Sequence, residues 1–103
     1  MSELPKAFKS FTENYPKVAE AYEKLGTEVH SAGPLEEKTR ALIKLSIAIG
    51  GKMEGAVHSH TRKALDAGCT KDEIRQTVLL SLTTIGLPSM MAAMTWVNDI
   101  LES

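Results

Sequence analysis

The sequence has a single cysteine, few aromatic residues and no long apolar run. One cysteine among 103 residues cannot form an internal disulfide, which fits a reducing compartment such as the cytoplasm. Aromatic residues make up 5% of the chain, so the core is expected to be aliphatic. No apolar run approaches the ~18 residues that a membrane-spanning helix needs, and residues 1–6 lack the apolar segment of a signal peptide. We therefore expect a cytoplasmic protein that does not enter a membrane.

Neither sign of charge dominates the chain. Twelve basic residues stand against thirteen acidic ones, for a net charge of −1, and the two kinds are interleaved. A nucleic-acid binder usually has a basic patch or stripe, so we expect no nucleic-acid partner. The hydrophobic content of 43% is ordinary for a globular protein and too high for a disordered one.

Glycine and proline divide the chain into helix-length pieces. Apolar residues recur three and four apart within these pieces, and no segment alternates with a period of two. Thr70 and Glu73 have the spacing of a capping box, in which each side chain bonds the backbone N–H of the other residue. The length allows one domain, and the pattern predicts an all-α bundle of about six helices. These cover residues 5–14, 16–33, 35–49, 53–67, 70–85 and 89–101.

Two of the predicted helices have more apolar surface than a small bundle needs. Between Ala41 and Ile49 only Lys44 and Ser46 are polar, and the last helix combines three methionines with Trp96. One explanation is a central core helix with a second helix closing over it. Contact between subunits is the better explanation, because wide apolar patches are uncommon on monomers. We therefore expect a homo-oligomer.

Two of the three histidines lie in the predicted helix 53–67, on different sides of it. His58 lies about 200° around the helix from His60, in a polar stripe with Glu54 and Arg62, and we expect it to pair with Glu54 at the surface. Histidines placed in this way are a poor metal chelate, so we expect no metal site. The opposite stripe consists mostly of apolar residues, namely Met53, Ala56, Val57, His60, Ala64 and Ala67.

His60 is the best candidate functional residue. One interpretation is a core histidine whose ring bonds a backbone carbonyl or a nearby carboxylate. The other is a general acid or base in a small apolar pocket. His30 is expected at a solvated helix end. Cys69 lies in the tight connection between Gly68 and Thr70 and has no Cys-x-x-Cys partner, which favours an inert thiol over a redox one.

Four stretches, taken in order and spacing, indicate a family. Together they resemble the carboxymuconolactone decarboxylase and alkyl hydroperoxidase D-like superfamily over residues 35–88, roughly half of the chain. The resemblance implies an all-α fold whose members assemble as trimers or as hexamers built from dimers. The stretches are residues 37–43 (EKTRALI), 60–68 (HTRKALDAG), 70–74 (TKDEI) and 86–88 (GLP).

The same resemblance suggests how the chain is organised. Residues 1–103 would form a single carboxymuconolactone decarboxylase-like domain. Its family core would cover residues 35–88, preceded by the N-terminal helices within residues 5–33 and followed by a C-terminal helix over residues 89–101.

The peroxidase branch of this superfamily, as the resemblance implies, uses four catalytic positions. They are a Cys-x-x-Cys pair, a histidine four residues after the second cysteine and a glutamate twelve residues before the first. Counted back from His60, the cysteine positions hold Met53 and Ala56, and the glutamate position holds Ala41. A thioether or a methyl group cannot form the thiolate that attacks a peroxide. An antioxidant peroxidase is therefore the least favoured function.

The decarboxylase branch, by the same resemblance, works without the cysteine pair and keeps a histidine in this helix. It implies a cofactor-free enzyme acting on a small carboxylated metabolite, such as a lactone or a 3-oxo acid, with His60 shuttling a proton. Glu37, one turn before Ala41, is a candidate acidic partner for His60, although a solvated first-turn glutamate also explains it. The substrate carboxylate would be steadied by cations, the candidates being Arg40, Lys44 and Arg62.

A second interpretation is a protein without chemistry. A binding or assembly protein would keep the fold and the pocket but would not turn over a substrate. In both interpretations the expected partners are other copies of the chain, as a homo-trimer or homo-hexamer, and a small-molecule ligand, with no cofactor.

Overall fold

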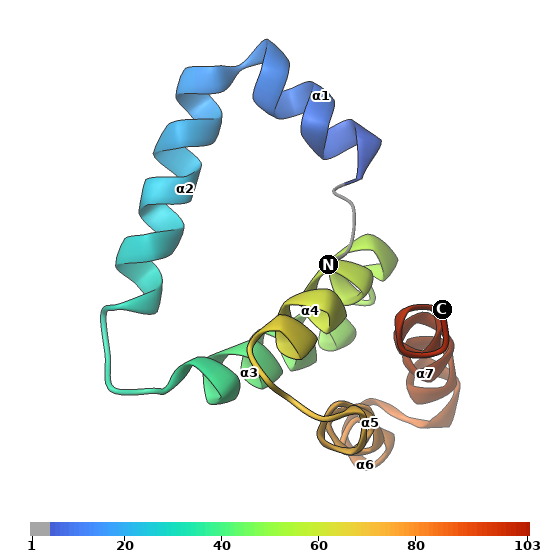
Figure 1. Cartoon of the computed structure of the whole chain (residues 1–103). Coiled ribbons are helices and arrows are strands. Elements are labelled where there is room, and N and C mark those ends of the chain that lie inside the picture. Colours follow the sequence, from blue (N-terminus) through green and yellow to red (C-terminus); the bar gives the residue numbers. More distant parts are fainter. Residues whose placement is uncertain (1–4) are drawn as a thin grey trace. The chain divides into compact units, whose positions relative to one another are not determined.

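The computed structural model describes residues 5–103, and their regular structure is entirely helical (Figure 1). This confirms the all-α fold class. The chain divides into two compact units, one ending at Leu35 and one covering Glu36–Ser103. The helices are α1 (Lys6–Asn14), α2 (Pro16–His30), α3 (Glu37–Gly50), α4 (Glu54–Asp66), α5 (Lys71–Leu79), α6 (Leu82–Ile85) and α7 (Leu87–Leu101).

The six predicted helices are present, but the fifth is divided into α5 and the single turn α6. At the break the Ser81 hydroxyl donates to the Val78 carbonyl over 2.6 Å, and the Thr84 hydroxyl donates to the Leu80 carbonyl over 2.9 Å. Side-chain bonds of this kind offer the backbone an alternative to the helical ladder. α7 begins two residues earlier than predicted and has Pro88 in its first turn, where a missing N–H costs nothing.

α1 and α2 form the first unit, and neither helix contains a buried residue. The Phe11 ring has a neighbour on each side, with centroids 6.2 Å from those of Phe8 and Tyr15. Most helical stability comes from packing an apolar face against another surface. An apolar face left open in this unit is therefore expected to pack against a further surface. An apolar stripe along α2 is between 56% and 65% exposed and consists of Val18, Tyr22, Leu25 and Val29.

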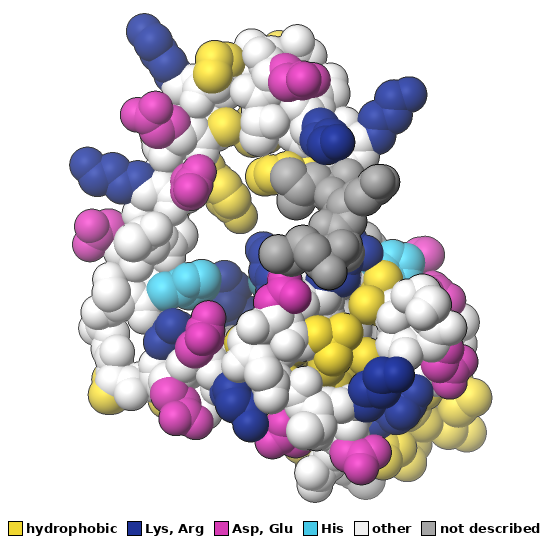
Figure 2. Space-filling model, viewed as in Figure 1, with side chains coloured by type: hydrophobic (Ala, Val, Ile, Leu, Met, Phe, Trp, Pro, Cys, Tyr) yellow, Lys and Arg dark blue, Asp and Glu magenta, His cyan; other side chains and the backbone are white. Residues whose placement is uncertain are grey.

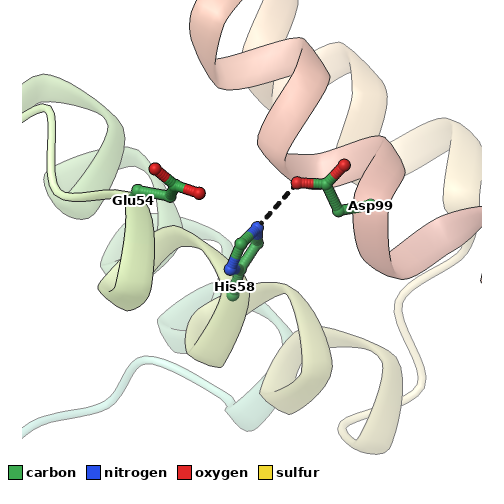
Figure 3. A group of neighbouring side chains, drawn as sticks. All are labelled: Glu54, His58 and Asp99. Carbon is green, nitrogen blue, oxygen red and sulfur yellow. Dashed lines mark hydrogen bonds and ion pairs between the residues drawn. The ribbon is translucent and has the colours of Figure 1, made fainter.

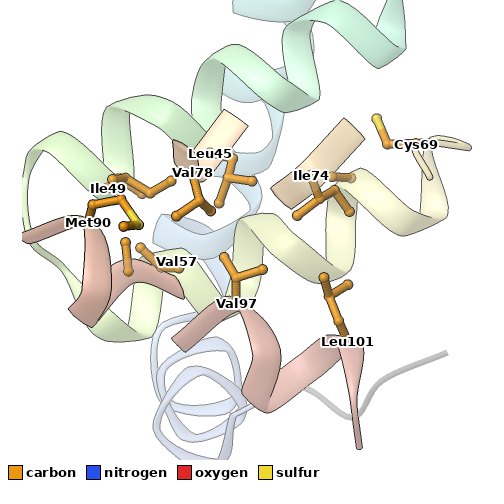
Figure 4. Packing of buried hydrophobic residues seen from close by; sticks show 12 residues of the cluster. Leu45, Ile49, Val57, Cys69, Ile74, Val78, Met90, Val97 and Leu101 are labelled. Carbon is orange, nitrogen blue, oxygen red and sulfur yellow. The ribbon is translucent and has the colours of Figure 1, made fainter. Parts of the chain in front are cut away.

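The core of the second unit lies where α3, α4, α5 and α7 meet (Figure 4). Aliphatic side chains dominate it, as the low aromatic content predicts. α3 packs on α4, and α7 packs on both α4 and α5. The largest apolar side chains with no exposed surface are Leu45, Ile74, Val57, Val78 and Val97.

The apolar excess predicted for α3 and α7 is partly used inside the second unit. In α7, Met90 and Val97 are buried, and Met94 and Trp96 pack against the core. The apolar surface left open comes from α3, from the region around the break after α5 and from the first turns of α7. Figure 2 shows hydrophobic side chains at the lower right, where α5, α6 and α7 lie in Figure 1. The most exposed large apolar residues of this unit are Ile47, Met53, Leu79, Leu80, Leu87 and Met91.

Within the described residues, no helix combines the length and the apolar character needed to span a bilayer. This agrees with the sequence, in which no apolar run is long enough.

The capping box predicted before α5 is confirmed. The Glu73 N–H donates to the Thr70 hydroxyl over 3.0 Å, and the Thr70 N–H donates to the Glu73 carboxylate over 2.7 Å. The bond from the Thr70 backbone is the main cause that lowers the pKa of Glu73, and Lys38 adds to the effect. Because a carboxyl group with a depressed folded pKa stabilises the fold above its unfolded pKa, this contribution is lost as the pH falls through the folded pKa.

We expect Thr70→Ala to lower the free energy of unfolding by about 1 kcal/mol, the usual cost of losing an N-terminal cap. Urea denaturation followed by circular dichroism measures this. Thr83→Ala, at an exposed position of α6, is the matched control and should stay within about 0.5 kcal/mol of wild type. Equal losses in the two variants would contradict the role assigned to the cap.

Because large apolar residues are exposed, we continue to expect that the protein associates with itself. Light scattering after size exclusion should give a mass well above the 11.2 kDa of one chain, because surfaces of this kind are usually covered in a soluble assembly. Leu80→Glu, at an exposed position, should shift the mass towards the monomer, whereas Lys71→Glu should not. A stable wild-type monomer at micromolar concentration would contradict this expectation.

Candidate functional site

The buried face of α4 includes only two residues of the predicted stripe, Val57 and Ala64. Val57, Thr61 and Ala64 are buried, whereas His60 is half-buried beside them. Thr61 enters the core because its hydroxyl donates to the Val57 carbonyl over 2.7 Å, so that its polar atom is satisfied. The predicted stripe included His60 and did not include Thr61. His60 instead lies on the flank of the packed face.

Three cations gather where α3 packs on α4. Arg40 and Lys44 lie one turn apart on α3, and both are half-buried. Burial is the main cause that lowers the pKa of Lys44, and the positive charges of Lys63 and Arg40 lower it further. Lys63 is on α4, three residues after His60, and residues at that spacing are neighbours on a helix surface. The three cations therefore form a basic cluster on the side of α4 that holds His60.

The positive charge of the basic cluster is suited to binding an anion. Because burial and like charges both disfavour the protonated form of Lys44, a carboxylate among the three side chains would reverse part of that effect and raise the Lys44 pKa. Sequence reasoning selected Arg40 and Lys44 but missed Lys63. The spacing of Lys63 to His60 along one helix was a usable signal for it.

Glu37 and Arg62 are the other two site residues predicted from the sequence. Glu37 is exposed in the first turn of α3, and its approach to His60 stays a prediction. Arg62 is half-buried on α4, but it lies about 200° around the helix from His60. Its role in holding the same carboxylate as Arg40 and Lys44 therefore also stays a prediction.

The partner expected for His58 was wrong. Its Nε2 atom bonds Oδ2 of Asp99 on α7 over 2.9 Å, instead of pairing with Glu54 on its own helix. The sequence pattern considered only neighbours within α4. Asp99 follows 41 residues later and reaches His58 because α7 packs on α4.

The positions that hold the catalytic groups in thiol peroxidases contain no nucleophile here. Met53 is exposed just before α4, and Ala56 is half-buried in its first turn. The single thiol, Cys69, is buried elsewhere, after the end of α4, and its Sγ lies 3.7 Å from the Lys38 carbonyl. Burial raises the pKa of this thiol, the Glu73 carboxylate raises it further, and Lys38 opposes them. A buried thiol with a raised pKa is a poor nucleophile.

A groove of about 700 Å³ opens between α3, α5 and α6. Its walls are mainly apolar, and none of His60, the basic cluster or Glu37 contributes to them. The groove is therefore separate from the candidate site. It is lined by Leu42, Ile43, Ser46, Ile49, Gly50, Glu73, Gln76, Thr77, Leu80, Ser81, Thr84 and Ile85.

Comparison with known families gives one clear result. Residues 16–99 match the carboxymuconolactone decarboxylase family. The match includes α2, which the motif resemblance did not cover. In three dimensions, the structure resembles the crystal structure of an apo carboxymuconolactone decarboxylase family protein from Legionella pneumophila. The TM-score is 0.78 at 22% identity, over 93% of this chain and 86% of that one, which supports the shared fold.

Curated relatives include two decarboxylases. The 4-carboxymuconolactone decarboxylase of Acinetobacter baylyi is 29% identical over 73% of this chain, and the nitrosuccinic acid decarboxylase of Metarhizium robertsii is 36% identical over 66%. The chain spans about half the length of these two proteins, 56% and 50% respectively. An uncharacterised protein of Methanocaldococcus jannaschii is 33% identical over 86% of this chain and 80% of its own length.

We expect the purified protein not to turn over alkyl hydroperoxides with a dithiol reductant, because neither Met53 nor Ala56 can form a thiolate. A coupled assay of reductant consumption measures this, with the uncatalysed reaction as the reference. Cys69→Ser should leave the background rate unchanged. Thiol-dependent turnover well above background that disappears in Cys69→Ser would contradict the prediction.

Proposed function

The chain belongs to the carboxymuconolactone decarboxylase family, and from that membership we propose that it is a cofactor-free enzyme carrying out acid–base chemistry on a small carboxylated metabolite. The basic cluster of Arg40, Lys44 and Lys63 on the His60 side of α4 is the observation on which this rests. A proton-transfer group next to a site that attracts an anion is what such a reaction needs.

His60 is the proton-transfer group in this proposal. When a 3-oxo acid loses CO2, the electrons of the breaking C–C bond move into an enolate, and the carbon then takes up a proton. A protonated imidazole near that carbon can donate this proton and recover it from water. Histidine is suited to both steps because its charge changes near neutral pH.

The basic cluster has a more specific task than holding the departing carboxylate. Cations that clamp this carboxylate equally in substrate and transition state would not accelerate its loss. They contribute to the rate when they bind the oxygen on which negative charge develops, or a second carboxylate that stays on the substrate. We assign Lys44 and Arg40 to this task, with Glu37 as the acidic partner that orients the His60 ring.

The two named relatives support the reaction class. Both are described as decarboxylases, and the family match over residues 16–99 contains the whole of α3 and α4. The free thiol of Cys69 fits a reducing compartment, and we place the enzyme in the cytoplasm.

A non-catalytic binding or assembly protein is the second candidate. The separate apolar groove and the open apolar residues of the second unit favour it, because both are suited to contacts with other protein surfaces. In that case the basic cluster would bind an anion without turnover.

We expect His60→Gln to lower kcat by about 100-fold or more, because general acid–base catalysis contributes roughly 10²–10⁴-fold and glutamine cannot carry a proton near pH 7. Release of CO2 from a panel of small 3-oxo acids and carboxylated lactones is the assay. Lys44→Gln should lower kcat/KM about tenfold or more, since it removes a charge-assisted contact to the oxygen on which charge develops or to the second carboxylate.

The control for both variants is Lys71→Gln, which removes an exposed charge at the start of α5 and should leave kcat and KM unchanged. Circular dichroism and light scattering establish that each variant keeps its fold and assembly. Full turnover in His60→Gln would refute the catalytic proposal. Binding of a carboxylate without any turnover in wild type would favour the second candidate.

A further inference from the structure

A second group of polar side chains lies at the contact between α4 and α7. Glu54 and His58 are one turn apart on α4, and Asp99 faces them from α7 (Figure 3). One ligating atom from each residue lies within 4.8 Å of the others. The His58 Nε2 and Asp99 Oδ2 atoms are 2.9 Å apart. Two helices that pack together therefore direct two carboxylates and one imidazole at the same point.

The two carboxylates of this group give it a negative charge that attracts a cation. In the part of the chain that the structure describes, the only ion pair of Asp99 is with His58, and Glu54 has none. When the imidazole is neutral, the three side chains have a net charge of −2. Their exposed fractions, 24% for the His58 side chain and 50% for that of Asp99, leave the group open to ions from solution.

We propose that Glu54, His58 and Asp99 form a site for a divalent transition-metal ion such as Zn²⁺, which joins α4 to α7. Imidazole nitrogen and carboxylate oxygen are both common zinc ligands, at about 2.0–2.2 Å from the metal. Tetrahedral ligands at that distance are roughly 3.3 Å apart. The His58–Asp99 pair is already close to this spacing. A rotation of the exposed Glu54 side chain brings its carboxylate to the same distance. Water completes the coordination.

The proposed metal site is separate from the candidate active site. His58 and His60 point to different sides of α4, about 200° apart, and the basic cluster lies on the His60 side. The ion would fix α4 against α7, because two of its ligands come from α4 and one comes from α7. An ion that binds only the folded state increases the free energy of unfolding as the metal concentration rises.

The test is a zinc titration of the full chain after removal of metal with a chelator. Isothermal calorimetry should show one Zn²⁺ bound per chain, and Tm should rise with Zn²⁺ concentration. Glu54→Gln is the decisive variant, because it removes one ligand and leaves the His58–Asp99 pair in place. It should weaken zinc binding by at least about tenfold, the lower end of the loss for even an outer-shell partner, and abolish the rise in Tm.

Asp99→Asn should weaken binding to a similar degree. The matched control is Asp66→Asn, at the exposed end of α4, which should bind Zn²⁺ as wild type does. Unchanged affinity in both Glu54→Gln and Asp99→Asn would place the metal elsewhere and overturn the proposal. No saturable binding in wild type would also overturn it and leave a His58–Asp99 ion pair only.

Discussion

The packing of α3 on α4 holds the candidate site together. Leu45, Ala48 and Ile49 of α3 and Val57 and Ala64 of α4 are buried in one core. Their burial supplies the free energy that brings like charges close on the flank of the same contact. Isolated from the core, Lys44 and Lys63 would separate, because their charges repel. The fold thus maintains a basic cluster that the cations by themselves would not form, and such preorganised charge is what an anion-binding site requires.

The two sides of α4 have different electrostatic surroundings. The basic cluster of Arg40, Lys44 and Lys63 lies on the His60 side, whereas Glu54, Asp99 and Arg62 lie on the His58 side. Two histidines separated by one residue therefore have different surroundings. Helical geometry alone accounts for the separation, since adjacent positions turn by about 100°. The chemistry of each ring then follows from what the neighbouring helix brings to that side.

Local sequence rules predicted the elements better than the contacts between them. The capping box at Thr70 and the ends of α3 and α4 near glycine depend on residues a few positions apart and were readable from the sequence, whereas α2 ends at His30, three residues earlier than predicted. The division after α5 was missed because hydroxyl bonds from Ser81 and Thr84 compete with a pattern that looks continuous. Asp99 beside His58 was missed because it comes from a helix 41 residues later, and the pattern of one helix does not contain the side chains of its neighbour.

The most direct test of the account is the titration of the Lys44 ammonium group by NMR, with and without a small dicarboxylate such as malonate. We predict that the pKa of Lys44 lies below its ordinary value in the free protein and rises when the dicarboxylate binds, while sodium chloride at equal ionic strength has little effect. A Lys44 pKa that does not respond to the dicarboxylate would contradict the claim that the α3–α4 contact forms an anion site beside His60.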